Sequence, residues 1–334
     1  GFIMKQKIVY FPTVSGANAY PLRMQEILAS IADVEGLNIR NVINEILKLN
    51  FSKKDILILN WIDSDIIGSN GTFSFKGISK LLVKILIFKL KFKKIIFVRH
   101  NFYPHSAKKE ISAKAKNLVD KLEVFFDHCV VHSPVFPNYK YEYIPHPLYK
   151  FPLKIDAKQD IKYDNNKFVI FGRISSYKKY EKIIEVFPCE HQLLIVGQCD
   201  DNAYLNKIQS LVKNKCNVSI SPFYLDDIKA KELINSTGGL IISHADDDMI
   251  VSGSFFYGLT LGIKMFAVAT PFLKWAEEQF GADVIETFPN VNVLCERLSD
   301  RPIRERINIK TVDNINALFS DAIIANTFKK LCEK

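Results

Sequence analysis

The 334-residue sequence has only six cysteines, and no two of them form a C-x-x-C pair. That scarcity argues against a zinc site and against a disulfide-stapled scaffold. The sequence does not begin with a charged segment followed by an apolar run and a small-residue cleavage site. No apolar run is long enough, without an interrupting lysine, to span a bilayer. We therefore expect a cytoplasmic protein with reduced thiols, no required metal and no membrane-spanning helix.

The sequence also lacks the signatures of two other classes of protein. No G-x-G-x-x-G follows the first apolar run, Lys7–Phe11, which disfavours a Rossmann dehydrogenase. Neither a zinc-finger framework nor an RRM-like aromatic motif accompanies the basic residues, which disfavours nucleic acid as a partner. The formal net charge of +9 instead suits phosphorylated ligands or an anionic membrane.

Short apolar runs alternate with helical patterns along the chain. Each run is rich in Ile, Val, Leu or Phe and ends in polar, glycine or proline residues. Buried runs of this kind with helical connections predict doubly wound, parallel α/β sheets. The expected strands are Lys7–Phe11, Ile56–Asn60, Lys94–Arg99, His128–His132, Tyr141–Pro145, Lys167–Gly172, Gln192–Gly197, Val218–Ser221, Gly239–Ser243 and Lys264–Ala269. The expected helices include Leu22–Ile31, Lys108–Phe125, Glu181–Phe187, Ala203–Val212 and Phe255–Leu261.

The chain is longer than one hydrophobic core usually supports, so we expect two domains. The stretch Tyr149–Lys167 is polar and has no clear periodicity, and the β–α alternation restarts after it. These features predict an N-terminal domain over 4–150, a linker over 151–166, a second domain over 167–312 and a C-terminal helix over 313–334.

One segment is strongly basic. No acidic residue occurs from Ile66 to Lys109, while apolar residues and lysines alternate at helical spacing. A helix with cationic and apolar faces is typical of attachment to a membrane surface. The alternative is a solvated lysine face whose apolar side packs on its own sheet. The residues that we expect to contact a membrane or its acceptor are Lys76, Lys80, Lys84, Lys89 and Lys91.

The segment "FVIFGRISSYKKYEKIIEVF" carries the most chemistry. A buried strand ends at Gly172, Arg173 follows it, and Lys178 comes after a short loop. Ligands of open α/β sheets bind beyond the carboxyl ends of the strands. A guanidinium and an ammonium there can hold a diphosphate. The alternative is a pair of surface cations at a strand end.

This segment resembles the G-R-x-x-x-x-K-G motif of GT-B glycosyltransferases of the GT4-like type, whose Arg and Lys bind the donor's diphosphate. Gly172, Arg173 and Lys178 match, whereas Lys179 replaces the final glycine. Other segments follow in the family's order, and the resemblance extends from about Val9 to Ala269. They are "PTVSGANAYPLRM" with Gly16 and Asn18, "IFVRHNFYPH" (similar to β-mannosyltransferase-like members) with His100 and His105, "EYIPHPLYK" with His146, and "LLIVGQC" with Gly197.

The segment "SHADDDMIVSGSFFYGLTLGIKMFAVATP" is similar to the family's most diagnostic region. There, a small-residue turn at a helix N-terminus presents N–H groups to the diphosphate. Ser252, Gly253 and Ser254 fit that turn. The family's two glutamates fall on Met249 and Tyr257, so the chain resembles a divergent branch. Asp246–Asp248 can supply a carboxylate or form a solvated loop.

The resemblance implies donor contacts by Gly16, Asn18, Arg173, Lys178, Gly197, Ser252–Ser254 and Tyr257. It also implies a role for His100, and next for His105, as the general base or as a contact to the donor sugar. Both histidines can instead be structural. "DSD" at Asp63–Asp65 and "DDD" at Asp246–Asp248 look like D-x-D metal sites, but GT-B enzymes use protein cations and helix N-termini, so we expect no metal or other cofactor.

The function implied is transfer of a hexose from a GDP- or UDP-sugar to a lipid-linked glycan. The acceptor would be a polyprenyl-diphosphate-linked oligosaccharide of bacterial surface polysaccharide synthesis, and the enzyme would be peripheral on the inner face of the cell membrane. Two alternatives stay open. One is a non-catalytic nucleotide-sugar-binding subunit, which the missing glutamates favour; the other is a GT-B-type nucleotide-sugar epimerase.

Overall fold

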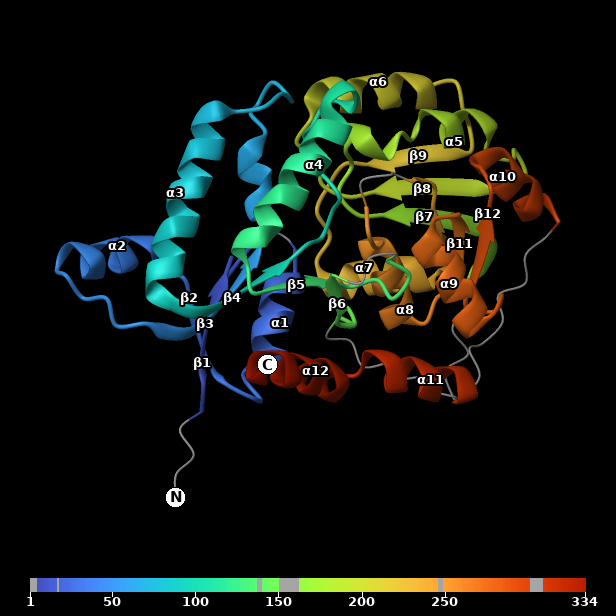
Figure 1. The fold of residues 1–334 in the computed structure, drawn as a ribbon. Helices are drawn as coiled ribbons and strands as arrows, with labels where there is room; N and C mark the ends of the chain where they lie inside the picture. Colours follow the sequence, from blue (N-terminus) through green and yellow to red (C-terminus); the bar gives the residue numbers. More distant parts are fainter. Residues whose placement is uncertain (1–4, 17, 137–139, 150–161, 246–248, 301–308) are drawn as a thin grey trace. The chain divides into compact units, whose positions relative to one another are not determined.

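A computed structural model of the chain describes residues 5–16, 18–136, 140–149, 162–245, 249–300 and 309–334 (Figure 1). The described residues fall into two compact units. Unit 1 comprises those within Gly1–Pro147, Asp247–Val251 and Leu318–Lys334, and unit 2 comprises those within Leu148–Asp246 and Ser252–Ala317. The C-terminal residues thus belong to the N-terminal half of the molecule.

Unit 1 contains a six-stranded sheet of order β2-β1-β3-β4-β5-β6, in which all pairs are parallel. Its strands are β1 (Lys7–Phe11), β2 (Asp33–Gly36), β3 (Lys54–Asn60), β4 (Phe92–Val98), β5 (His128–Val131) and β6 (Tyr141–Tyr143). Its helices are α1 (Tyr20–Leu28), α2 (Ile39–Leu47), α3 (Phe75–Lys91), α4 (Ser112–Leu122) and α12 (Asp321–Glu333). Three 3-10 turns complete it: η1 (Ile62–Ile66), η2 (Lys109–Ile111) and η3 (Glu123–Phe125).

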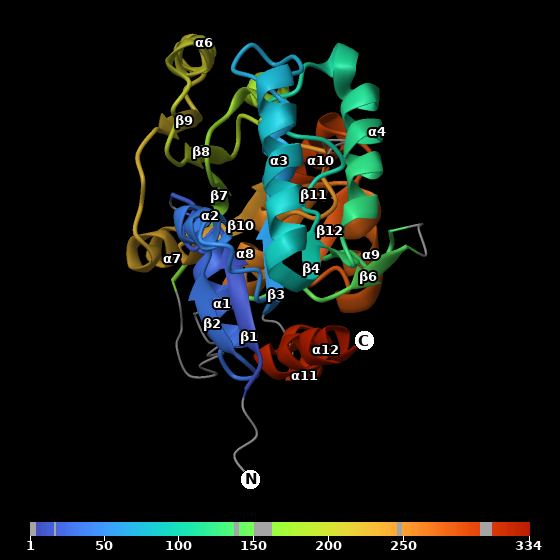
Figure 2. The same ribbon diagram turned by 60° about the vertical axis from the view of Figure 1, so that its left-hand side comes forward.

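The sheet of unit 1 has a hydrophobic core on each face. Because successive strand residues point to opposite faces, Leu57 of β3 packs with α3 and α4, whereas Ile58 packs with α1 and α12. Figure 2 shows α3 and α4 side by side. Because helices cover both faces of the sheet, we expect a functional site at its carboxyl edge.

Unit 2 contains a second all-parallel sheet, of order β12-β11-β10-β7-β8-β9. Its strands are β7 (Asp164–Phe171), β8 (Gln192–Val196), β9 (Val218–Ser221), β10 (Thr237–Ile242), β11 (Met265–Val268) and β12 (Ile285–Phe288). Its helices are α5 (Glu181–Val186), α6 (Asn202–Val212), α7 (Asp227–Asn235), α8 (Gly253–Leu261), α9 (Pro271–Phe280), α10 (Val291–Ser299) and most of α11 (Ile309–Phe319), and η4 (Ser176–Lys178) is a 3-10 turn. In sequence order the strands run 6-5-4-1-2-3, which is the Rossmann arrangement.

The expected fold class is confirmed, and all ten expected strands are present with small shifts at their ends. The sequence missed β2 and β12, because both are short edge strands that contain acidic residues. The C-terminal helix expected over 313–334 is two helices, because Ser320 ends one and caps the next by accepting a hydrogen bond from the Ile323 N–H. The expected helix Lys108–Phe125 is shorter, with a 3-10 turn at each end of α4. Of the expected linker, 151–161 lies outside the described residues and 164–166 belongs to β7.

Candidate functional site

The sheet order predicts a binding place in unit 2, at the carboxyl edge between β7 and β10. At this point the strand order reverses, so the connections leave in opposite directions and open a space at the carboxyl edge. Gly172 follows β7, Gly197 follows β8, and Ser243 follows β10. Gly172 and Gly197 both have positive φ, of 133° and 155°, and a Cβ on Gly197 would overlap the Gly172 carbonyl. The absence of a side chain at Gly197 therefore allows the ends of β7 and β8 to pack against each other.

Lys178 and Ser254 converge over Gly172. A Cβ on Gly172 would lie 3.2 Å from the Lys178 Nζ and 4.0 Å from the Ser254 Oγ. Lys178 is buried, and its ammonium lies 6.0 Å from the centre of the Tyr177 ring. Lys178 and Ser254, which are far apart in the sequence, thus place an ammonium and a hydroxyl beside Gly172, which has no side chain.

The N-terminus of α8 adds backbone donors to this place. Ser252 is the N-cap, and its Oγ accepts a hydrogen bond of 3.3 Å from the Phe255 N–H. Nothing lies within 4 Å of the Cβ position of Gly253. The first N–H groups of a helix attract anions. The predicted Ser252–Ser254 turn and the predicted Lys178 are therefore brought together.

The loop that carries Lys178 has a strained exit. Lys179 adopts a left-handed conformation with φ of 49°, which glycine tolerates and lysine resists. Tyr180 is fully buried, and its N–H donates to the Tyr204 hydroxyl at 2.9 Å. This hydrogen bond fixes the backbone two residues after Lys178.

Arg173 differs from Lys178 in its surroundings. Its guanidinium is exposed and forms an ion pair of 3.2 Å with the exposed carboxylate of Asp200. An ion pair between exposed side chains is weak and exchanges readily with water. Arg173 therefore comes directly after Gly172 in the chain, but its guanidinium is exposed and paired with Asp200.

Polar atoms without partners are gathered at this edge of unit 2. Within the described residues, the buried hydroxyls of Ser175, Ser243 and Tyr257 have no hydrogen-bond partner. Tyr257 stacks on Phe171 at 4.8 Å, and its ring also contacts Tyr149 at 5.4 Å. Burial raises the pKa of Tyr257, so it stays a neutral donor. Buried polar groups usually have hydrogen-bond partners, so these three hydroxyls are able to bond a ligand at this edge.

Ser243 and His244 are two further residues of this edge that were not predicted from the sequence. Both are buried directly after β10, and His244 meets the edge of Tyr177 at 6.1 Å. Their position after a predicted strand at the reversal point is the signal that would have found them. The predicted acidic residues Asp246–Asp248 lie outside the described residues.

Unit 1 holds a cluster of aromatic and imidazole rings at the carboxyl edge of its own sheet. The rings belong to segments that follow adjacent strands or begin α1, and the Tyr20 ring contacts all the others at 4.9–5.6 Å. Trp61 stacks on His100 with 4.4 Å between ring centres. We call this group the imidazole cluster: Tyr20, Trp61, His100, His132 and His146.

Hydrogen bonds indicate which ring nitrogen of His100 and of His132 carries the proton. The Asn60 amide donates to the Phe11 carbonyl at 3.0 Å, so its oxygen faces His100 and accepts from His100 Nε2 at 2.8 Å. His100 Nδ1 is therefore the nitrogen with a lone pair. His132 Nδ1 donates to the Ile144 carbonyl at 2.7 Å, and its Nε2 accepts from the Tyr20 hydroxyl at 2.6 Å.

Burial keeps the cluster uncharged. The pKa of His132 falls to about 4 because its ring is buried, and burial likewise lowers the pKa values of His100 and His146 well below the ordinary value. The neighbouring imidazoles add to the effect on His100. A neutral imidazole with an oriented lone pair can accept a hydrogen bond or a proton from a substrate hydroxyl.

The loop after β4 is held by a buried arginine. The Arg99 guanidinium donates to the carbonyls of Asn101 and Phe102 and pairs with Asp120 and Glu123 at 2.6 Å. This network fixes the backbone on either side of His100. His105, the second predicted histidine, lies on the exposed part of the same loop.

Asp63 is a further titratable group that the sequence analysis left out of the site. It lies in η1, and burial raises its pKa to about 6, against the opposing charges of Arg99 and His105.

Gly16 and Asn18 lie in unit 1, in the loop between β1 and α1. Gly16 has φ of 52°, which glycine adopts without strain. The Asn18 carboxamide oxygen accepts from the Tyr20 N–H at 3.0 Å. Asn18 thus positions the start of α1 and the Tyr20 ring of the imidazole cluster.

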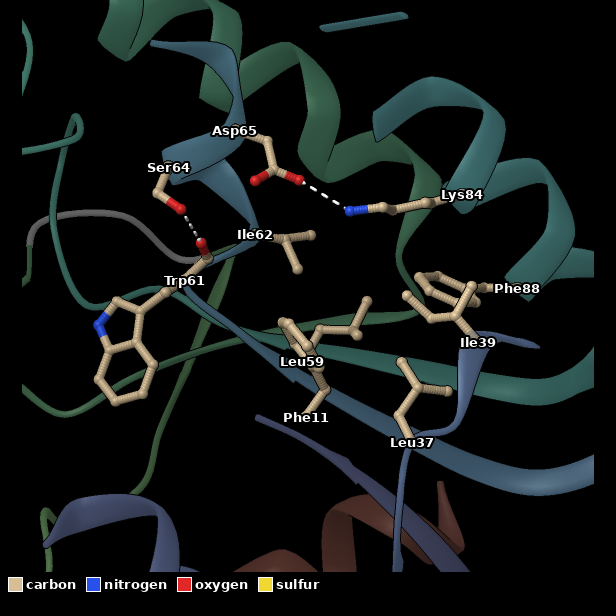
Figure 3. Close-up of a pocket in the computed structure, with 10 residues that line it drawn as sticks. All are labelled: Phe11, Leu37, Ile39, Leu59, Trp61, Ile62, Ser64, Asp65, Lys84 and Phe88. Atoms are coloured by element: carbon tan, nitrogen blue, oxygen red, sulfur yellow. Dashed lines mark hydrogen bonds and ion pairs between the residues drawn. The ribbon is translucent and has the colours of Figure 1, made fainter. Parts of the chain in front are cut away.

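A small cavity of about 80 Å³ lies beside this edge of unit 1 (Figure 3). Apolar side chains such as Leu59 and Phe88 line most of it, and an ion pair of 3.1 Å joins Asp65 and Lys84 at its rim. Pockets for drug-sized ligands usually measure about 300–1,000 Å³. This cavity is therefore too small for a nucleotide sugar.

The five predicted lysines all lie on α3, but in different surroundings. Lys76, Lys80 and Lys89 are exposed. Lys84 pairs with Asp65, and the fully buried Lys91 pairs with Glu45 at 2.6 Å. No helix in the described part of the chain is long and apolar enough to cross a membrane. Within those same residues, no group of His, Cys, Asp and Glu side chains has the arrangement of a metal site.

Comparison with known proteins gives matches in structure only. No protein family and no curated protein matches the chain by sequence. The fold is similar to that of HepE (Alr3699) from Anabaena in complex with UDP and glucose, with a TM-score of 0.63, 10% identity and coverage of 98% of this chain and 99% of HepE.

A glycosyltransferase from Rickettsia africae is similar with a TM-score of 0.59, 12% identity and coverage of 99% and 98%. Staphylococcus aureus TarM, solved with UDP, has a TM-score of 0.58 and 12% identity, and the match covers 88% of this chain and 58% of TarM. Together with the two parallel sheets, these matches show that the chain has the GT-B fold of two Rossmann-like domains.

Proposed function

We propose that this protein is a glycosyltransferase that moves a hexose from a nucleoside-diphosphate sugar to an acceptor hydroxyl. The carrying observation is the convergence of Lys178 and Ser254 over Gly172, next to the open N-terminus of α8. Such a place suits a diphosphate, because one cation and several N–H donors meet at it. HepE, which has the same fold, was solved in complex with UDP-glucose.

The reaction forms a bond between the acceptor oxygen and the anomeric carbon, and it breaks the bond from that carbon to the diphosphate. The nucleoside diphosphate leaves with the electron pair. Lys178 and the α8 N–H groups would stabilise this growing negative charge, which gives them a larger effect on kcat than on ground-state binding. Arg173 would join them by leaving the exposed Asp200 when the donor binds.

The acceptor hydroxyl loses a proton during the reaction, and we propose that His100 accepts this proton. Its Nε2 is committed to Asn60, so the Nδ1 lone pair is the one available to a hydroxyl. Because its pKa is lowered, the ring is unprotonated at neutral pH. We place His105 second, because it lies on the exposed part of the same loop.

Tyr257 takes the position of the ribose-binding glutamate in the GT4-like resemblance. Its hydroxyl has no partner among the described residues, so we propose that it donates to the donor's ribose. Gly16 and Asn18 would contribute through the loop that carries them. This protein would then be a divergent GT4-like member that uses a neutral donor in place of a carboxylate.

The acceptor that we propose is a polyprenyl-diphosphate-linked glycan of bacterial surface polysaccharide synthesis, used at the inner face of the cell membrane. UDP-sugars are the first donors to test, followed by GDP-sugars. The experiment is transfer of labelled hexose to lipid-linked acceptor, with excess EDTA present to test the expected independence of metal. The proposal predicts full turnover in EDTA and a large loss in His100→Ala, with His128→Ala as the control.

A non-catalytic nucleotide-sugar-binding subunit is the second candidate, favoured by the absence of an acidic side chain at Met249 and Tyr257. Tight donor binding without transfer to any acceptor would favour it. Conversion of the free nucleotide sugar into an epimer would instead indicate a GT-B-type epimerase.

A further inference from the structure

We infer that the outer face of α3, together with the segment after α2, docks unit 1 onto an anionic lipid bilayer. The inference extends the proposed function, because it names the surface by which a transferase would reach a lipid-linked acceptor. Its support lies in exposure and charge within unit 1 alone, so it can be tested without a sugar donor.

Helix α3 is apolar on two faces. Its inner face buries Leu81, Ile85 and Phe88 against the sheet, as expected of an α/β unit. Its outer face repeats large apolar residues at helical spacing, which places them in one stripe. These residues are Phe75 (82% exposed), Leu82 (39%), Val83 (55%), Leu86 (62%) and Leu90 (48%).

This arrangement differs from that of an ordinary covering helix, which turns one apolar face inward and a polar face to water. In the described chain these five side chains remain exposed, and Figure 2 shows the helix that carries them. A contiguous apolar patch on a soluble unit usually marks an interaction surface.

Lysines flank the stripe on both sides. On the helical projection Lys89 lies on one side, and Lys76 and Lys80 lie on the other. All three are exposed, and no ion pair involving them occurs in the described ranges. An apolar stripe flanked by lysines is typical of helices that lie in a membrane interface.

The apolar surface continues beyond α3. Leu47, Leu49 and Phe51 are exposed to 75%, 78% and 51%. This segment is fastened to the C-terminal end of α3, because Lys91 donates to the Asn50 carbonyl at 3.0 Å and pairs with Glu45. Lys91 thus holds this exposed apolar segment beside the C-terminal end of α3, and the exposed Lys48 and Lys53 add positive charge to the segment.

The charges favour a bilayer over a second copy of the chain. In a two-fold dimer the same patch meets itself, so the lysines of one copy would approach those of the other. The sequence from Ile66 to Lys109 has no acidic residue to offset them. An anionic bilayer offers both partners that the surface needs, a negative headgroup layer and an apolar interior.

The test is sedimentation with phosphatidylcholine vesicles with or without phosphatidylglycerol, in the absence of nucleotide sugar. Wild type should bind the anionic vesicles and lose binding as salt increases. Lys76→Gln/Lys80→Gln/Lys89→Gln should bind on the order of 100-fold more weakly, because each lysine contributes a factor of about five. Leu86→Gln/Leu90→Gln should also lose binding, whereas the controls Val124→Gln and Lys114→Gln, exposed elsewhere in unit 1, should not.

A second measurement keeps the inference testable if a variant folds poorly. Leu86→Trp should show blue-shifted emission with anionic vesicles, because the indole enters the interface, whereas Val124→Trp should not. Equal binding by the two sets of glutamine variants and their controls would overturn the inference. So would a self-association in wild type that Leu86→Gln/Leu90→Gln abolishes without any vesicle binding. Since no donor is present, either result leaves the transfer reaction untouched.

Discussion

Acid should destabilise unit 1 through the imidazole cluster. The pKa of His132 is about 4 in the folded chain and about 6.5 when unfolded. The unfolded chain therefore takes up a proton first, and the free energy of unfolding falls as pH drops from about 6.5 toward 4. Between pH 7 and pH 5, His132 alone removes about 2 kcal/mol.

Other titratable groups of unit 1 also change the free energy of unfolding as the pH falls. His100 and His146 have lowered pKa values and add losses of the same sign. Asp63 opposes them, because its folded pKa of about 6 exceeds its ordinary value. Its protonation in the folded state restores about 1 kcal/mol by pH 5. Asp63→Asn should therefore make the acid loss steeper.

The assay is urea unfolding followed by Trp61 fluorescence. The chain has two tryptophans, so Trp275→Phe leaves Trp61, stacked on His100, as the reporter of unit 1. The free energy of unfolding at pH 5 should lie several kcal/mol below that at pH 7, and His132→Gln should flatten this dependence. Equal stability at both pH values in the Trp275→Phe protein, with or without Asp63→Asn, would refute the reasoning.

Three further predictions concern residues near the carboxyl edges of the two sheets. Gly197→Ala should destabilise unit 2 by roughly 3 kcal/mol because its Cβ would overlap the Gly172 carbonyl, whereas Gly253→Ala, with open space, should leave the thermal midpoint unchanged. Lys179→Gly should stabilise by about 1 kcal/mol because it relieves a left-handed φ, as chemical denaturation would show; no gain would argue against strain there. The acid limb of the pH–kcat profile should lie below pH 6.5, because the His100 pKa is lowered, and a limb above 6.5 would exclude His100 as the base.

The fold class was predictable because buried parallel strands leave continuous apolar runs in the sequence. The edge strands β2 and β12 were not, since a half-exposed strand such as Asp33–Gly36 carries no such run. The break at Ser320 was also missed, because a single capping serine is a weak signal within an otherwise helical pattern.

The candidate site was predictable in part. Spacing alone could not place Ser254 beside Lys178, because their proximity arises from the strand order of unit 2; the resemblance supplied it. The pairing of Arg173 with Asp200 and the burial of Lys91 depend on side-chain surroundings that a sequence does not reveal. The histidines were visible one by one after successive strands, yet their assembly around Tyr20 needed the register of four strands.

The outer stripe of α3 illustrates the same limit. The sequence showed lysines and apolar residues at helical spacing, and the simplest interpretation gave one face to each. The structure buries Leu81, Ile85 and Phe88 and still leaves a second apolar face outside. The sequence of a helix with apolar residues on two faces does not reveal which of those residues face inward.

The most direct test of the central claim is calorimetric titration of UDP and GDP, and then of their sugars, into wild type and Lys178→Gln. Lys182→Gln, whose lysine is exposed on α5, is the matched control. We expect wild type and Lys182→Gln to bind a nucleoside diphosphate with equal affinity. Lys178→Gln should bind at least about tenfold more weakly, which corresponds to the loss of one charge-assisted contact of about 1.5 kcal/mol. Equal affinity in all three proteins, or no nucleotide binding by wild type, would contradict it.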